Sequence, residues 1–547
     1  MSSDEINSKH APDPIVYNKQ DRVLIVVSAV AIIFFISQIL MFRYGRDQGI
    51  FVMVSDAILH GGMPYRDAWD FKPPGIYFFF TLARFLFGSH QIGIRVVECA
   101  GLITSSFWMV KLAEHWWNDR RVGYVAAAMA LMVHAQLDFW HTAQPESFGG
   151  MLTIGALWLW ARSENRPLEG RYVAAFVAGI MFGFAGLLKP PLIAGSAVFS
   201  AAFLHRSWES QPEASRAQRL LPAVKPIAIV WAGTSVPLIL CGLWFLAGGA
   251  LRDLWEVLFL FTPHYTALGW QGRPALDMLY QAALNVFAMY SSTLAVGMVL
   301  FLAVPSKRSY RGIFMVLGLI AFHVVGIALQ AKFFAYHYGA TFPLVALLAA
   351  IGYVKLWNRL SVRTWWMSGL YFAAFCTVTS IASATVDSRL TFFKRTANRI
   401  GLAFAEFRDA DSVDSLASVV DVNAAANRTV AQYVKDNTPA SCSMFVWGFE
   451  PVIYDLAQRR PASRYLYNLG QRIPHTRRAL RALMMRELEQ SKPCAIVVEH
   501  SDVFPLVSGT NIDSASELPN FIELSQFINN DYSAARKIED FDVYLRH

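Results

Sequence analysis

The chain has 547 residues, of which 55% are hydrophobic and 16% are charged, and it carries 40 Phe and 16 Trp. Soluble proteins are about 25% charged, so this composition excludes an ordinary soluble protein and indicates that much of the surface faces lipid. The net charge of +8 would suit a nucleic-acid partner. However, the Lys and Arg residues lie in short runs between apolar stretches, which is typical of membrane topology and argues against nucleic acid.

The first 20 residues are polar and precede a long apolar run with no small-residue cleavage pattern, which predicts a signal anchor. A membrane helix needs about 20 mostly apolar residues. The candidate spans, eleven in number, are residues 23–42, 91–113, 122–139, 147–162, 173–188, 191–204, 226–247, 280–303, 312–330, 339–357 and 365–386. The apolar stretch 76–87 is too short to span, so we expect it to lie at the interface or to re-enter.

Charge assigns the two sides of the membrane. Lys and Arg residues gather between alternate spans, in segments 1–22, 111–121, 162–171, 206–225, 307–311 and 355–363. With eleven spans these segments all lie on one side, which the positive-inside rule makes cytoplasmic. We therefore predict a cytoplasmic tail at 1–22, a polytopic α-helical transmembrane domain at 23–386 and an external domain at 387–547.

The external C-terminal segment differs in composition from the rest of the chain, because charged residues return there. Short β-like runs alternate with helical stretches, at 443–447, 495–498 and 543–545 and at 427–436 and 477–489 respectively. This alternation predicts an extramembrane α/β domain. Cys442 and Cys494 both lie in this segment, and outside the cytoplasm they can pair if their backbones approach closely enough, a distance that the sequence does not give.

The first long external loop, residues 43–90, is too patterned for a passive connector. Asp47 follows the first span closely, and apolar residues at helical spacing predict an amphipathic interfacial helix over 48–59. Gly61 and Gly62 end that helix, and the segment around Lys72 is stiffened by two prolines. An acid and a lysine at headgroup depth suit a transfer reaction in which the acid takes a proton from a hydroxyl and the lysine holds a departing lipid phosphate.

At these residues the chain resembles the GT-C glycosyltransferases. The resemblance is closest to the protein-mannosyltransferase-like group, family 39, which includes the bacterial aminoarabinose transferases that act on lipid A. Its motifs are Asp47-Gln48-Gly49, Pro64-Tyr65-Arg66-Asp67, Lys72-Pro73-Pro74-Gly75, Gln144-Pro145-Glu146-Ser147-Phe148, residues 332–343, Val446-Trp447-Gly448, Pro461 and Arg464-Tyr465. In overall layout it covers about 90% of the chain.

The resemblance implies a function and a location. Such enzymes sit in the bacterial inner membrane and take a sugar from a polyprenyl phosphate on the external, periplasmic face. They transfer it, usually with inversion, to a hydroxyl of a lipid, glycan or protein. Asp47 then matches the catalytic acid that activates the acceptor, and Lys72 matches the lysine near the donor phosphate. Many members have Asp-Glu where this chain has Asp47-Gln48, so no second acid is expected at position 48.

Further candidates come from the other external segments. Glu146 is either a helix N-terminal acid favoured by the helix dipole or, as the resemblance implies, a second acid that positions the acceptor or helps to bind a metal. Lys332, His337 and Tyr338 form a tight turn, which either anchors the protein at the interface or contributes to the lipid-phosphate pocket that the resemblance implies. Lys189 is either a snorkelling lysine or a further phosphate ligand.

The remaining residues have less specific roles. The substrate-pocket candidates are Tyr65, Arg66, His264, Tyr265, His337 and Tyr338. His264 and Tyr265 lie in segment 248–279, a loop long enough to cover a donor. A divalent cation is compatible with His and carboxylate side chains on separate loops. No Asp-x-Asp pair occurs in the first loop, so we predict neither a specific metal site nor any other cofactor.

Several charged or ionisable residues near these candidates are less specific. In the first loop, Arg66, Asp67 and Asp70 either form stabilising ion pairs or contact substrate. Asp138 and His141 are weaker neighbours of Glu146.

Two other classes of protein compete with the enzyme. A multi-span transporter or flippase of a lipid-linked or anionic substrate would also need many spans, but it predicts charges within spans and repeated halves, and the chain shows few of the former and no internal repeat. A sensory protein predicts longer cytoplasmic segments. The sequence therefore favours a glycosyltransferase whose partners are a polyprenyl-phosphate sugar donor, a lipid, glycan or protein acceptor, and membrane lipids.

Overall fold

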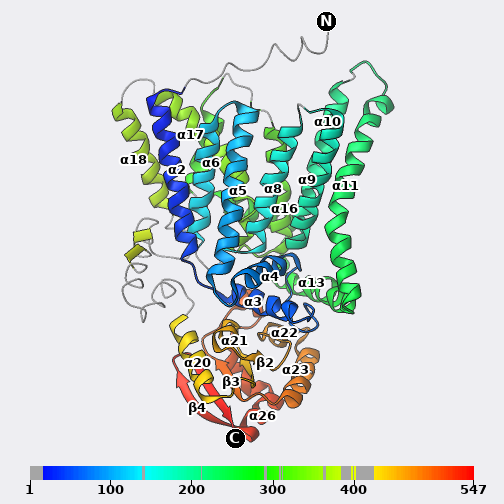
Figure 1. The fold of residues 1–547 in the computed structure, drawn as a ribbon, viewed down its shortest axis with the longest axis vertical. Helices are drawn as coiled ribbons and strands as arrows, with labels where there is room; N and C mark the ends of the chain where they lie inside the picture. The colour runs from blue at the N-terminus through cyan, green and yellow to red at the C-terminus, as the bar shows by residue number, and fades with distance from the viewer. Residues whose placement is uncertain are drawn as a thin grey trace.

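The computed structural model describes residues 17–137, 142–164, 166–210, 212–288, 292–306, 310, 312–360, 365–382, 396–397, 400–401 and 424–547. Figure 1 shows three layers along the long axis. A bundle of roughly parallel helices forms one end, an α/β domain forms the other, and short helices of the first loop lie between them.

The bundle is built from long helices. They are α2 (Lys19–Leu40), α5 (Ile92–Trp117), α6 (Arg120–Gln136), α8 (Pro145–Ser163), α9 (Leu168–Leu188), α10 (Gly195–Ser210), α11 (Arg216–Ala247), α14 (Ala275–Ala288), α15 (Ser292–Ala303), α16 (Ile313–Gln330), α17 (Phe342–Leu360) and α18 (Trp365–Ala382). Within the described residues, each predicted span falls on one of these helices, except that 280–303 is divided between α14 and α15 and that the 3₁₀ turn η1 (Pro190–Ala194) precedes α10. The ends of two predicted spans, 138–139 and 383–386, lie outside the described residues.

Five helices in the described part of the chain are long and apolar enough to cross a membrane, namely α2, α5, α11, α16 and residues 169–188 of α9. Large apolar side chains also point out of the bundle: Leu302 is 78% exposed and Phe314 is 89% exposed. Water would oppose such a surface, whereas lipid favours it. The protein is therefore an α-helical membrane protein.

The first loop forms two helices that cross the end of the bundle (Figure 1). α3 (Arg46–Leu59) confirms the predicted helix but not its amphipathic character, because residues 48–55 are all buried. α4 (Gly75–Phe87) is the short apolar stretch. α4 begins at a glycine because a Cβ atom there would lie 2.7 Å from the carbonyl oxygen of Leu187 at the end of α9. The loop is thus packed directly against the bundle.

Segment 248–279, which we expected to be a loop, is largely helical. It forms α12 (Leu251–Trp255), the π-helical turn η2 (Glu256–Phe261) and α13 (Thr262–Trp270). Its apolar residues Leu254, Val257, Leu258 and Phe261 follow helical spacing and pack into the same hydrophobic cluster as the first loop. This spacing is a helical signal that was already present in the sequence.

The C-terminal domain contains a five-stranded sheet in the order β2-β1-β3-β5-β4. The strands are β1 (Ser443–Trp447), β2 (Arg460–Pro461), β3 (Ala495–Glu499), β4 (Tyr532–Ile538) and β5 (Phe541–Arg546). The helices are α20 (Ala424–Asn437), α21 (Val452–Ala457), α22 (Leu469–Arg472), α23 (Arg477–Ser491), α24 (Pro505–Ser508), α25 (Ser514–Glu517), η6 (Leu518–Asn520) and α26 (Ile522–Asp531). The predicted strands β1, β3 and β5 and the predicted helices α20 and α23 are confirmed, and the α/β character with them.

Parallel pairing of β1 with β3 brings two cysteines together. Met444 is in register with Ala495, so the residues that precede these strands lie at the same edge of the sheet. Cys442 and Cys494 form a disulfide there, with their Cα atoms 5.9 Å apart. The distance that the sequence left open is therefore within the range for a disulfide.

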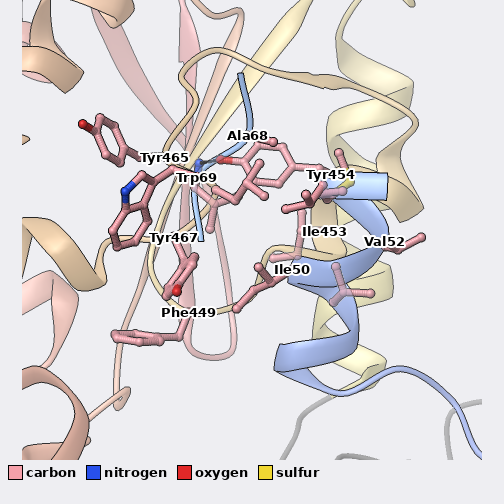
Figure 2. Packing of buried hydrophobic residues seen from close by; sticks show 14 of the residues in the cluster. Ile50, Val52, Ala68, Trp69, Phe449, Ile453, Tyr454, Tyr465 and Tyr467 are labelled. Atoms are coloured by element: carbon pink, nitrogen blue, oxygen red, sulfur yellow. Dashed lines mark hydrogen bonds between the residues drawn. The ribbon is translucent and has the colours of Figure 1, made fainter. Parts of the chain in front are cut away.

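The first loop and the C-terminal domain share one hydrophobic core (Figure 2). Trp69 of the loop packs beside Tyr465 and Tyr467, and its backbone N–H donates to the carbonyl oxygen of Arg464 at 2.8 Å. A Cβ atom at Gly49 of α3 would lie 2.8 Å from the backbone nitrogen of Val452, so α3 and α21 are in direct contact. The C-terminal domain therefore fixes the position of the loop.

Candidate active site

Asp47 and Lys72 meet at the start of α3. The Gln48 side chain accepts from the backbone N–H of Gly45 at 2.9 Å, which caps the helix and places Asp47 in its first turn. The Lys72 ammonium donates to one carboxylate oxygen of Asp47 at 3.0 Å. The Gln144 amide donates to the other oxygen at 2.9 Å. Both oxygens of the predicted catalytic acid are therefore held, one by the predicted lysine and one by an amide.

Lys72 is almost fully buried and lies between two aromatic rings. Its Nζ atom is 4.9 Å from the ring centre of Phe51 and 5.0 Å from that of Phe71. Its carbonyl oxygen accepts from the Tyr65 hydroxyl at 2.7 Å. Burial lowers the pKa of Lys72, but the charges of Asp47 and Asp70 outweigh it and raise that pKa overall. The side chain therefore stays an ammonium ion.

Asp70 is buried and is held by two tyrosines instead of a cation. The Tyr77 hydroxyl donates to it at 2.9 Å and the Tyr467 hydroxyl at 2.7 Å. Of the ion pairs suggested for the first loop, the one between Arg66 and Asp67 forms, at 2.7 Å. Tyr467 comes from the C-terminal domain, so that domain reaches the site directly.

Glu146 and Lys189 form a second acid–lysine pair, with Nζ and Oε1 2.7 Å apart. Glu146 lies in the first turn of α8, where a carboxylate also suits the helix dipole. Lys189 lies between α9 and the 3₁₀ turn that follows it. Glu146 therefore occupies the helix N-terminal position of the first interpretation, and it also pairs with a lysine.

Lys332 has a different environment from the other two lysines. It is 4% exposed, and among the described residues its ammonium has no hydrogen-bond partner. Its Nζ atom lies over the ring of Tyr265, 2.9 Å from the ring centre. Burial, with a smaller contribution from the charge of Lys189, lowers the pKa of Lys332 to about 6. Lys332 is thus a buried amine whose donors no described side chain occupies.

The two acid–lysine pairs and Lys332 belong to one site. The charge of Glu146 acts on Lys72, and the charge of Lys189 acts on Lys332. Two packed rings connect Lys332 with Lys72. Lys332 lies over the ring of Tyr265, the ring centre of Tyr265 is 4.4 Å from that of Phe71, and Lys72 lies over the ring of Phe71. Burial raises the pKa of Tyr265, and the charges of Asp47 and Asp70 raise it further.

The other candidates lie around this cluster or away from it. One ring nitrogen of His337 lies within hydrogen-bond distance of the carbonyl oxygen of Lys332, and the ring of Tyr338 packs near Phe342. His264 is exposed and stacks on His475, with ring centres 3.8 Å apart.

Arg66 lines a separate cavity of about 820 Å³, which it shares with residues near the end of α3. Asp47 begins that helix, and ~13 residues of helix span ~20 Å. The structure therefore does not bring Arg66 or His264 into contact with the acid–lysine pairs. Asp138 and His141 lie outside the described residues.

A metal ion would need several ligands, and the described part of the chain contains no group of three His, Cys, Asp or Glu side chains arranged to hold one. The carboxylates of Asp47 and Glu146 each face a lysine instead. The described side chains therefore do not fit a bound divalent cation.

Two contacts in the site were not predicted from the sequence. Gln144 stood in the quoted Gln-Pro-Glu-Ser-Phe motif, so its position was visible although no role was assigned to it. Tyr467 carried no signal, because only the folded chain brings it 2.7 Å from Asp70.

The fold combines a helical membrane bundle, a helical first loop that carries an acid and a lysine, and a small α/β domain. Residues 71–217 match the family described as dolichyl-phosphate-mannose-protein mannosyltransferase. The fold is similar to that of ArnT from Cupriavidus metallidurans bound to undecaprenyl phosphate, with a TM-score of 0.55 and 14% identity over 95% of this chain and 97% of that one.

The apo state of the same ArnT gives a TM-score of 0.56 with 12% identity over the same shares of the two chains. The archaeal oligosaccharyltransferase AglB from Archaeoglobus fulgidus matches with a TM-score of 0.45 and 13% identity, over 88% of this chain and 69% of that one. No curated protein matches the sequence. The resemblance found first at the motifs is confirmed by the family match over residues 71–217 and by the similarity of the fold to that of ArnT.

Proposed function

We propose that this protein is a membrane glycosyltransferase that moves a sugar from a polyprenyl-phosphate donor to a hydroxyl of a lipid, glycan or protein. The observation that carries the proposal is the Asp47 carboxylate, held by Lys72 at 3.0 Å. An acid paired with a lysine suits a reaction in which a hydroxyl loses a proton while a phosphate departs.

The reaction is a displacement at the anomeric carbon. The acceptor oxygen forms a bond to that carbon, the carbon–oxygen bond to the phosphate breaks, and its electron pair leaves on the polyprenyl phosphate. The acceptor proton passes to Asp47. One in-line displacement inverts the anomeric configuration, as the resemblance implies.

The lysines divide the charge of the leaving phosphate. An ammonium group has three N–H donors, so Lys72 can hold Asp47 with one and the phosphate with another. Lys332 contributes donors that no described side chain occupies. Lys189, which is paired with Glu146, adds a positive charge close enough to Lys332 to act on it. Because the site is buried, these interactions are stronger than they would be in water.

The site would face the outside of a bacterial inner membrane. The predicted eleven spans, the cytoplasmic N-terminus and an external domain over 387–547 agree with an arrangement in which α3, α4, α13 and the α/β domain lie at one end of the bundle (Figure 1). The disulfide between Cys442 and Cys494 supports this orientation, because disulfides persist in oxidising compartments.

Asp47→Asn tests the proposal. In one experiment, the envelope glycolipids of cells with the wild-type protein and of cells with the variant are compared by mass spectrometry. In a second, purified protein is supplied with polyprenyl-phosphate sugars and sugar transfer is measured. Loss of an essential base costs about 10²–10⁴-fold in turnover. Asp67→Asn, in the same loop but paired with Arg66, is the matched control and should keep its activity. Unchanged products from a well-expressed Asp47→Asn variant would show that Asp47 is not needed for the reaction. A wild-type protein that transfers no sugar would refute the proposed glycosyltransferase activity.

A further inference from the structure

Three ionisable side chains are buried within the bundle near the site. Arg95 and Glu98 lie on α5 and are fully buried, and His134 on α6 is 7% exposed. Arg95 donates to Glu98 at 3.0 Å, and a ring nitrogen of His134 lies 2.8 Å from the other Glu98 oxygen. Buried charges in a membrane helix are costly, so they are expected to have a role beyond packing.

The remaining hydrogen bonds of this trio point to two backbone segments. Arg95 donates to the carbonyl oxygens of Arg43 at 2.7 Å and Phe42 at 3.3 Å, just before α3. It also donates to the Thr142 hydroxyl at 2.9 Å. Glu98 accepts from the backbone N–H of Ala143 at 2.5 Å. The trio thus ties the segment that leads to Asp47 to the segment that precedes Gln144.

These two segments carry the groups that meet in the site. Gln144, next to Ala143, donates to Asp47. Gln48, next to Asp47, donates to the carbonyl oxygen of Thr142 at 2.6 Å. Every backbone group held by the trio is therefore within a few residues of Asp47 or Glu146.

We propose that Arg95, Glu98 and His134 are positioning residues that hold the two segments in register, so that Gln144 meets Asp47 and Glu146 meets Lys189. The inference rests on the proposed function. Displacement of a reacting group by ~1 Å can cost ~10²-fold in rate without unfolding a protein. The Glu98 carboxylate is central, because it joins Arg95, His134 and the Ala143 backbone.

The inference separates turnover from donor binding. The predicted donor phosphate is held by Lys72, Lys332 and Lys189, none of which contacts the trio in the described contacts. Glu98→Gln keeps the side-chain shape but removes the charge that pairs with Arg95. We therefore expect turnover to fall by about 10- to 100-fold, whereas KM for the donor should stay within about threefold. The Tm in detergent should also fall, because Arg95 loses its buried counter-charge.

A pair of variants at His134 distinguishes positioning from general stability. His134→Gln keeps an N–H donor for Glu98 and should retain most of the turnover, whereas His134→Leu cannot donate and should lose turnover as Glu98→Gln does. Ser106→Ala is the matched control, because Ser106 is buried on α5 but bonds only within its own helix, to the carbonyl oxygen of Leu102. It should behave as the wild type.

The outcomes are separable. Turnover of Glu98→Gln equal to wild type would overturn the inference and leave the proposed function intact. Equal losses of turnover and Tm in His134→Gln and His134→Leu would also overturn it, because they would indicate a structural role alone. A wild-type protein that transfers no sugar would refute the proposed function itself. If Glu98→Gln does not fold, the His134 pair decides.

Discussion

Asp47 and Glu146 each face a lysine, but only one of them is accessible. The Asp47 side chain is 24% exposed and that of Glu146 is 2% exposed. An incoming hydroxyl can therefore reach the Asp47 carboxylate, whereas Glu146 is enclosed with Lys189. This difference supports Asp47 as the proposed base and gives Glu146 the supporting role of fixing Lys189.

The pH dependence of donor binding should come from Lys332. Burial, with the charge of Lys189, lowers the pKa of Lys332 to about 6, and a bound phosphate would raise it again. Binding then takes up a proton at any pH above that value, so affinity is full below pH 6 and falls by up to about tenfold per pH unit as the pH rises.

Equilibrium binding of a sugar-linked donor phosphodiester, measured between pH 5.5 and 8, tests this. The diester keeps one charge throughout that range, so the slope reports the protein. Lys332→Met should bind weakly with little pH dependence. Lys355→Met, in the last turns of α17, is the control and should keep the wild-type slope. The same slope in Lys332→Met as in the wild type would exclude Lys332 as the titrating group.

At the scale of elements, α3 is held by contact with α21. Gly49→Ala would place a Cβ atom 2.8 Å from the backbone nitrogen of Val452, which cannot rotate away. We expect the variant to be destabilised by about 1–3 kcal/mol, as for overpacked cores, and its turnover to fall because Asp47 lies two residues away.

Thermal unfolding in detergent, followed together with turnover, measures both effects. Gly242→Ala is the control, because it adds the same methyl group at a helical position where, apart from the helix's own nearby backbone, no described atom lies within 4 Å of the new Cβ. It should unfold at or slightly above the wild-type temperature. A Gly49→Ala protein as stable and active as Gly242→Ala would show that α3 and α21 can separate without cost.

Elements with a strong pattern of their own were predictable from sequence. The bundle helices and α3 were found because their apolar residues repeat at helical spacing, and the buried strands β1 and β3 because they are short continuous apolar runs. β4 was missed because five of its seven residues are exposed, so it has no apolar alternation. The short β2 exists through its pairing with β1 and has no pattern of its own.

The site was predictable only in part, for a related reason. Asp47 and Lys72 lie 25 residues apart in one loop, so the sequence could suggest their meeting. Gln144 and Tyr467 approach the same loop from a different span and from the C-terminal domain. Contacts at such separations depend on the folded bundle and on the shared core, which a single sequence does not reveal.

At the scale of the whole molecule, the disulfide should stabilise the C-terminal domain. Cys442 and Cys494 are separated by 52 residues, and a crosslink over a loop of that size contributes about 2–4 kcal/mol by restricting the unfolded chain. Cys494→Ser should therefore lower the midpoint of unfolding of this domain, measured by limited proteolysis along a temperature series. Cys376→Ser, which removes a free thiol on α18, is the control. Equal midpoints for both variants would contradict the prediction.

The proposed orientation predicts which surfaces an impermeant thiol reagent can reach. Ser516 is exposed on the C-terminal domain, and Glu213 is exposed in the segment between α10 and α11. Figure 1 shows the connection between these two helices at the end of the bundle away from the C-terminal domain. In right-side-out membrane vesicles, Ser516→Cys should be labelled at once, because the domain is external. Glu213→Cys should be labelled only after permeabilisation, because the positive-inside rule makes that basic segment cytoplasmic. Labelling of the unsubstituted protein gives the background from its own free cysteines. Immediate labelling of Glu213→Cys in sealed vesicles would reverse the topology and move the acid–lysine site to the cytoplasmic face.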